Sequence, residues 1–180
     1  MQRTTARLIL RPPEPSDLPR LHAIYGDPAT NTFNPAGPLT DIAQARTLLQ
    51  GWRDQWRDKG MGPWAIALRS APERLLGFGG ISSHGYLGVE RINVGYRFDR
   101  AAWGAGYATE LGAAALAFGF DECRLPEIFA LVRPAHLASI RVLEKIGMQR
   151  FATLDDVPGQ APSIVFRALH PSPASAPPGP

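Results

Sequence analysis

The chain has 180 residues, of which 44 % are hydrophobic and 19 % charged, and its formal net charge at pH 7 is +3. A chain of this length and balance is expected to fold into one domain with a sizeable core. Its arginines are scattered rather than gathered in a block, which argues against a nucleic-acid partner. No hydrophobic run approaches the roughly 18–20 residues of a membrane span, so no membrane partner is expected.

The chemistry-bearing residue types narrow the options further. Cys123 is the only cysteine, which excludes an internal disulfide and fits a reducing cytoplasm. The first residues run into an apparent strand without the hydrophobic core of a signal peptide, so a cytoplasmic location is expected. The histidines lack metal-ligand spacing, and no metal site is expected.

The N-terminal part of the chain predicts one strand and two helices. Leu8 and Leu10 alternate in a strand over 7–11, and Ser16 is expected to cap a short helix that runs to about residue 25. Residues 27–39 are rich in Asp, Pro, Asn and Gly and are expected to form a loop. Thr40 is expected to cap a second helix that ends at Gly60, with a stripe of apolar residues that favours core packing: Ile42, Ala45, Leu49, Trp52 and Trp56.

Three strands are predicted next, over 63–69, 74–83 and 90–98. The intervening segments 70–72 and 83–86 are typical of hairpin turns, so these strands should be antiparallel.

After residue 99 the pattern changes to alternating helices and strands. It predicts helices over about 106–119 and 137–146, and strands over about 127–132, 149–154 and 162–168. Strands separated by a helix imply a parallel pair, so we expect a mixed, mostly antiparallel α/β sheet. Residues 1–170 are expected to form this single domain, and residues 171–180 lack core-forming residues and should be a disordered tail.

The segment 103–110, Trp-Gly-Ala-Gly-Tyr-Ala-Thr-Glu, lies between a predicted strand and a predicted helix. Its glycines allow backbone N–H groups to crowd an anion, and the helix adds its positive N-terminal end, which together would make a pyrophosphate cradle. A Gly-x-Gly pair alone also fits a simple tight turn. The chain lacks the Gly-Lys-Ser/Thr of a P-loop, and Thr109 stands where a dinucleotide fingerprint needs its third glycine.

Two longer motifs surround this segment. Residues 93–98 read Asn-Val-Gly-Tyr-Arg-Phe, and residues 132–148 read Val-Arg-Pro-Ala-His-Leu-Ala-Ser-Ile-Arg-Val-Leu-Glu-Lys-Ile-Gly-Met. With 103–110 between them, they closely resemble the acetyl-CoA signature of the GNAT acetyltransferase superfamily. The branch they resemble most is that of the ribosomal-protein-alanine N-acetyltransferases (RimJ/RimL-like). The resemblance covers about residues 5–168 and implies a GNAT fold of about seven strands and four helices, with a central parallel pair that splays apart.

The resemblance also implies acetyl-CoA as the acetyl donor and assigns residues to it. Backbone at the end of the 90–98 strand would pair with pantetheine amides, and the glycine loop would hold the pyrophosphate. The hydroxyl of Ser139 would approach the CoA sulfur and help to protonate the leaving thiolate. The cofactor-binding set expected on this basis is Tyr96, Arg97, Phe98, Trp103, Gly104, Ala105, Gly106, Tyr107, Ala108, Thr109, His136 and Ser139.

Two positions depart from the family pattern and concern the proton transfer. His136 stands where the family has Asn, so it either contacts the cofactor or caps the helix, or it takes part in catalysis together with Ser139. Asn93 stands where many members have a Glu that some are thought to use as a base. Asn93 cannot take up a proton, so the base lies elsewhere or is water. Phe33, Asn93 and Glu90 are the residues expected to line the acceptor site, with His84 and Asp155 as further polar candidates near it.

The function expected from the resemblance is direct attack of a primary amine on the acetyl thioester in a ternary complex, with a small molecule as the acceptor. Two alternatives stay open. One is an enzyme that acetylates the N-terminal amine of a protein or peptide, and the other is a non-catalytic acyl-CoA-binding protein. Dimers are frequent in the family, which allows a homodimer without requiring one.

Overall fold

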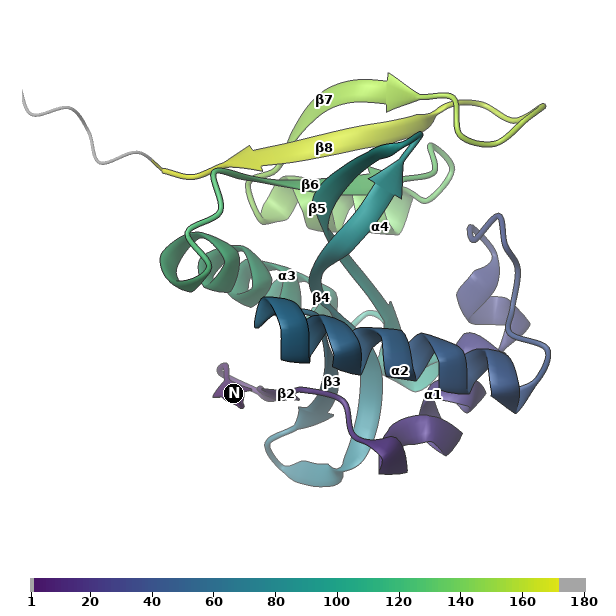
Figure 1. Ribbon diagram of the computed structural model, residues 1–180, viewed down its shortest axis with the longest axis vertical. Helices are drawn as coiled ribbons and strands as arrows, with labels where there is room; N and C mark the ends of the chain where they lie inside the picture. The colour runs from purple at the N-terminus through teal and green to yellow at the C-terminus, as the bar shows by residue number, and fades with distance from the viewer. Residues whose placement is uncertain (1, 172–180) are drawn as a thin grey trace, which may run out of the picture.

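The computed structural model describes residues 2–171 and shows a single mixed sheet with helices on both faces (Figure 1). The α-helices are α1 (Leu18–Tyr25), α2 (Ile42–Lys59), α3 (Tyr107–Ala117) and α4 (Leu137–Lys145). The strands are β1 (Arg3–Thr4), β2 (Leu8–Arg11), β3 (Pro63–Leu68), β4 (Ala71–Tyr86), β5 (Val89–Phe98), β6 (Glu127–Val132), β7 (Gln149–Leu154) and β8 (Ser163–Leu169). Residues 172–180, nearly all of the expected tail, lie outside the described residues.

The strand order is β1-β2-β3-β4-β5-β6-β8-β7. Every neighbouring pair is antiparallel except β5 and β6, which run parallel. The mixed sheet with one parallel step is therefore confirmed, and its eight strands exceed the expected number by one because the two-residue β1 pairs with β2.

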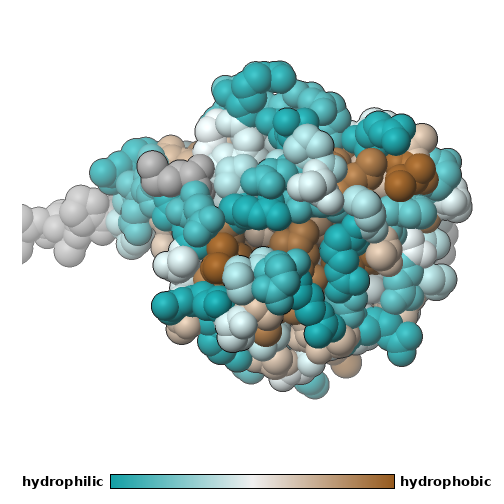
Figure 2. Space-filling model, turned by 90° about the horizontal axis from the view of Figure 1, so that it is seen from below, coloured by the Kyte–Doolittle hydropathy of each residue, from teal (hydrophilic) through white to brown (hydrophobic). Residues whose placement is uncertain are grey.

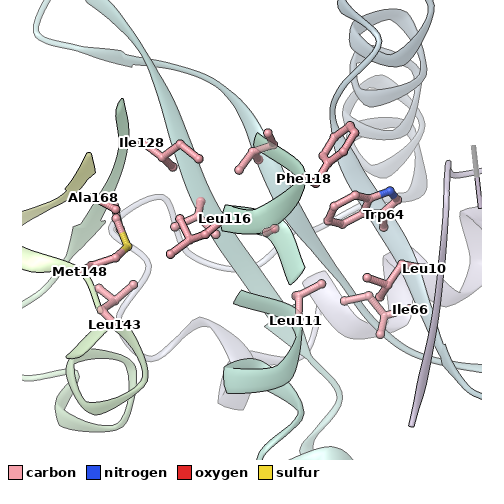
Figure 3. Close-up of a cluster of buried hydrophobic side chains, with 14 of the residues drawn as sticks. Leu10, Trp64, Ile66, Leu111, Leu116, Phe118, Ile128, Leu143, Met148 and Ala168 are labelled. Atoms are coloured by element: carbon pink, nitrogen blue, oxygen red, sulfur yellow. The ribbon is translucent and has the colours of Figure 1, made fainter. Parts of the chain in front are cut away.

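The two faces of the sheet carry different helices, and each face has its own core. Helices α1 and α2 cover β3 and β4 through a cluster that includes Leu21, Leu49, Trp52 and Phe78. On the opposite face α3 and α4 pack through a larger cluster. Figure 3 shows how Leu111 and Leu116 of α3 lie between the strands that carry Leu10 and Ile66 and the strand that carries Ile128.

At the end of the molecule that carries the turn between β3 and β4, the surface is mostly hydrophilic (Figure 2). Hydrophobic side chains form only separated patches on that face.

Several boundaries differ from the predictions. Helix α2 is capped by Asp41, whose carboxylate accepts from the N–H of Gln44 at 2.9 Å, and Thr40 lies one residue outside. Ser16 is not a cap either, because it lies inside a 3₁₀ turn over Pro15–Asp17 that precedes α1. The expected turn at 83–86 is strand, and the hairpin turns at Leu87 and Gly88, where φ is 48° and 88°. Two positive φ values in succession match the twist of a two-residue hairpin.

Helix α3 ends two residues earlier than expected and continues as a π turn over Phe118–Glu122. Gly119 lies in this turn against β6, and a Cβ there would come within 2.5 Å of Ile128 Cδ1. The π turn thus brings the backbone close to the sheet, at a point where an added Cβ would have to displace the end of the Ile128 side chain.

We expect Gly79→Ala to destabilise the fold by roughly 1–3 kcal/mol, because a Cβ there would lie 2.6 Å from Tyr96 Cβ and 2.7 Å from the carbonyl oxygen of Gly95. Gly85→Ala in the same strand is the matched control, since no atom lies within 4 Å of its added Cβ. Urea unfolding of the two variants measures the difference. Equal midpoints would contradict the close approach of β4 and β5.

Candidate active site

The site is organised by the point at which β5 and β6 separate. The two strands pair at one position, Asn93 with Phe129. Just beyond it, the side chain of Asn93 takes the place of the ladder: its Oδ1 accepts from the Leu131 N–H at 3.2 Å and from the Tyr86 hydroxyl. The N–H of Leu131 in β6 thus has an acceptor although no strand pairs with it there. The two strands can therefore diverge without leaving this donor unpaired.

The amide of Asn93 is therefore occupied within the sheet. Its Nδ2 donates to the carbonyl of Val94 at 3.0 Å, so both ends of the side chain have protein partners. The substrate contact expected for Asn93 stays a prediction, and any such contact would compete with these hydrogen bonds.

Beyond Asn93, the segment from Gly95 to Phe98 pairs with β4 on one side and, among the described residues, with no strand on the other. At its end, the carbonyl of Phe98 accepts from Trp103 Nε1 at 3.1 Å. The backbone groups of Gly95 to Arg97 that face away from β4 are thus open to an extended ligand, as at the edge of a sheet.

The glycine loop leads from this strand into α3. Gly104 and Gly106 adopt φ values of +76° and +80°, and α3 begins directly afterwards at Tyr107. In the part of the chain that the structure describes, the N–H groups of residues 104–109 have no backbone acceptor. Six successive free donors at the positive end of a helix fit an anion of the size of a pyrophosphate.

This loop is held from behind by the N-terminal strand segment, a support that the sequence did not predict. Glu110 accepts from Thr5 Oγ1 at 2.5 Å and from the N–H and Nε of Arg7, both at 2.7 Å. Arg7 also donates to the carbonyl of Ala105 at 2.8 Å and lies over the ring of Tyr107. Burial alone would raise the pKa of Glu110, but the bonds from Thr5 and Arg7 outweigh it and hold the pKa below its ordinary value.

Two hydroxyl groups meet beside the separated strands. Tyr96 projects from β5 toward α4, where its hydroxyl lies 2.8 Å from Ser139 Oγ. Burial raises the pKa of Tyr96 to about 12, so at neutral pH the phenol keeps its proton. The structure thus brings together two residues of the predicted cofactor set as a hydrogen-bonded, proton-carrying pair.

Phe33 and His136 are also brought together, from segments about a hundred residues apart. Their rings stack with centroids 4.3 Å apart and planes 18° apart. His136 occupies the N-cap position of α4, but its side chain makes no capping hydrogen bond. Burial lowers the pKa of His136 below 6.5, so the imidazole is neutral at physiological pH.

Glu90 lies away from these groups, on the hairpin between β4 and β5. Lys59, at the end of α2, donates to Glu90 at 2.8 Å and to Ser83 Oγ at 2.5 Å. The hydrogen bond from Lys59 lowers the pKa of Glu90, which makes the carboxylate a weaker base. His84 is exposed on the same hairpin, edge-on to Tyr86.

Residues 7–149 match the model of the acetyltransferase (GNAT) domain. The chain belongs to the GNAT acetyltransferase family. It is 36 % identical to the Bacillus subtilis protein YkkB over 153 residues, which cover 83 % of this chain and 86 % of that protein. The separated strands and the glycine loop both lie within the matched region of this GNAT N-acetyltransferase domain. Among residues 2–171, no helix combines the length and apolar character that a membrane crossing requires.

Two solved structures share the GNAT fold at low sequence identity. One is spermidine N-acetyltransferase from Vibrio cholerae in complex with CoA and spermine, with a TM-score of 0.75, 16 % identity and coverage of 92 % of this chain and 97 % of that one. The other is RimL, a ribosomal L7/L12 α-N-protein acetyltransferase in complex with CoA, with a TM-score of 0.74, 15 % identity and coverage of 93 % and 96 %. At these identities, both comparisons speak for the fold alone.

We expect Asn93→Ala to lower the free energy of unfolding by roughly 2 kcal/mol, because the N–H of Leu131 loses its acceptor in a buried place. Amide hydrogen exchange at Leu131 should quicken in the same variant. Tyr86→Phe is the matched comparison, since it removes the other donor to Asn93 and leaves the Leu131 bond in place. Unchanged exchange at Leu131 in Asn93→Ala would refute the role of this side chain in separating the strands.

Phe33→Ala should raise the pKa of His136 toward its ordinary value, because the stacked ring contributes to the burial of the imidazole. An NMR titration of the imidazole Cε1–H of His136, in the wild type and in the variant, measures this. Because burial depresses the folded-state pKa, His136 stabilises the fold above about pH 6.5, and this contribution is lost as the pH falls below that value. The loss should be smaller in Phe33→Ala. An unchanged His136 pKa in Phe33→Ala would show that the ring of Phe33 does not shield the imidazole from solvent.

Proposed function

We propose that this chain transfers the acetyl group of acetyl-CoA to the primary amine of a small molecule, by direct attack in a ternary complex. The observation that carries the proposal is the Tyr96–Ser139 hydroxyl pair, which lies beside an open strand edge that leads to the glycine loop. These features supply the three things the reaction needs: a place for the donor, an opening for the thioester, and a proton for the departing sulfur.

Each part of the donor has a matching part of the chain. The free amides of residues 104–109 would hold the pyrophosphate, with Trp103 and Tyr107 beside it, and the open edge of Tyr96 and Arg97 would pair with the pantetheine amides. When bound, acetyl-CoA supplies the activated acetyl group. An N–H of the open β5 edge is suited to polarise the thioester carbonyl, because no strand partner competes for it there.

The side chains of the site account for the proton that the thiolate gains and the proton that the amine loses. The amine nitrogen forms a bond to the carbonyl carbon, the carbon–sulfur bond breaks, and Ser139 donates a proton to the sulfur while Tyr96 replenishes it. The proton lost by the amine passes to the neutral imidazole of His136 or to water, since Asn93 cannot accept it and Glu90 is bound to Lys59.

A small acceptor is favoured by the contact between the loop that joins α1 and α2 and the start of α4. Phe33 of this loop stacks on His136, which places an aromatic wall at the N-terminal end of the helix that carries Ser139. An aromatic wall at this position suits a small amine better than an extended chain. The RimL likeness keeps the N-terminal amine of a protein as the second candidate acceptor, and spermidine N-acetyltransferase provides a small-amine precedent on the same fold.

The remaining alternative is a non-catalytic acyl-CoA-binding protein. Asn93 favours this alternative, because it stands where many family members have a Glu. Release of free CoA thiol from acetyl-CoA, measured against a panel of small amines and N-terminal peptides, separates the three functions. Tight acetyl-CoA binding without thiol release on any amine would overturn the proposal. We further propose a cytoplasmic location, in keeping with the free Cys123, and keep the homodimer as a prediction.

Ser139→Ala should lower kcat by about ten- to a hundredfold, because the leaving thiolate then has to take its proton from water. Tyr96→Phe should cause a smaller loss, since Ser139 keeps its own hydroxyl. Ser70→Ala, on the exposed turn between β3 and β4, is the control and should leave kcat unchanged. Thiol release under saturating acetyl-CoA gives the comparison, and a Ser139→Ala enzyme as fast as the wild type would remove Ser139 from the mechanism.

A further inference from the structure

Arg97 is a half-buried cation without an acidic partner. No carboxylate of residues 2–171 forms an ion pair with it, although eleven other ion pairs are present in this part of the chain. Its guanidinium lies 4.3 Å from the centroid of the Tyr25 ring and donates one hydrogen bond, to Oδ1 of Asn31. A guanidinium has five N–H donors, so most of its hydrogen-bonding capacity is unused.

Asn31, which accepts this hydrogen bond, has no further hydrogen-bonding capacity for Arg97. Asn31 is 5 % exposed, and its Nδ2 donates to the carbonyls of Tyr25 and Asp27 at 2.9 and 2.8 Å. Its Oδ1 also accepts from Asn34 at 2.9 Å. Asn31 is therefore saturated, and it fixes one edge of the guanidinium while leaving the rest of the fork without a protein partner among residues 2–171. Partial burial of a positive charge is costly unless an anion or further acceptors complete it.

Arg97 lies on the face of the sheet opposite the Tyr96–Ser139 pair. Side chains alternate along a strand, so Arg97 points to the face opposite Tyr96. Tyr96 packs with α3 and α4, which hold the donor site, whereas Arg97 contacts Tyr25 of α1 and Asn31 of the loop that follows it. The same loop reaches His136 two residues later through Phe33. The sheet is interrupted beside these residues, because β5 has no β6 partner after Asn93.

We propose that Arg97 forms an anion subsite for the acceptor, so that the preferred substrate is an amine that also carries a carboxylate. This inference rests on the proposed function and names its substrate class. A guanidinium pairs with a carboxylate through two parallel N–H···O bonds, a geometry that a fork held at one edge by Asn31 is suited to offer. The carboxylate has two sources, a free amino acid or a peptide with an acidic residue next to its N-terminal amine.

The test uses pairs of acceptors that differ only in this charge: alanine against alaninamide, and the amidated dipeptides Ala-Asp against Ala-Asn. For the wild type, we expect kcat/KM to favour the carboxylate member of at least one pair by tenfold or more, and the pair that shows it identifies the source. In Arg97→Met the ratio within that pair should fall to about one. Because the ratio compares two substrates on one enzyme, a general loss of activity or of folded protein cancels. Arg46→Met removes an exposed charge on α2 and should leave the ratio unchanged.

A binding measurement keeps this inference separate from the reaction itself. In the presence of CoA, calorimetry should show N-acetylalanine or N-acetyl-Ala-Asp amide binding at least tenfold more tightly than its neutral counterpart, with the difference lost in Arg97→Met. Discrimination in binding without turnover of any amine would sink the proposed function and support the subsite. Turnover of neutral and carboxylate amines at equal kcat/KM, or a ratio that survives Arg97→Met, would overturn the subsite while leaving the acetyltransferase intact.

Discussion

The hydrogen bond between the side chain of Asn93 and the N–H of Leu131 is the interaction on which the site depends. A sheet can be opened in its middle only if the backbone groups that lose their ladder find other partners. Asn93 supplies an acceptor for β6 at the last paired position, and Trp103 supplies a donor for the carbonyl at the end of β5. Between these two points the edge of β5 is left open for a ligand.

The alternation of side chains along β5 then divides the chemistry between two faces. Tyr96 points to the helices α3 and α4 and meets Ser139, while Arg97 points to α1 and meets Asn31. In the proposed reaction, donor and acceptor approach from opposite sides and meet where the sheet is interrupted. Consecutive residues of one strand contact different faces because the period of a strand is two, and the proposed reaction uses one of them for each substrate.

Much of the fold and of the glycine loop could be predicted from the sequence. The features that could not be predicted depend on contacts between distant parts of the chain. The strand Glu127–Val132 agrees with the prediction of a strand over about 127–132, and the glycine loop was predicted from the conformational demands of a helix N-terminus. The polar run 83–86 was mistaken for a turn because its pairing with β5, not its composition, decides its conformation. Likewise, nothing near Asn93 or Phe33 in the sequence reveals partners in Leu131 and His136, since long-range contacts leave no local pattern.

The contacts of Glu110 with Thr5 and Arg7 span 105 and 103 residues of chain. Closing so long a loop has an entropic cost that local helix formation does not, so we expect these contacts with the glycine loop to form late in folding. These contacts also couple the order of the peripheral β1–β2 ribbon to the order of the glycine loop. A ligand that binds the ordered loop therefore reduces fraying of the N-terminal ribbon, and fraying of that ribbon in turn lowers the affinity for the ligand.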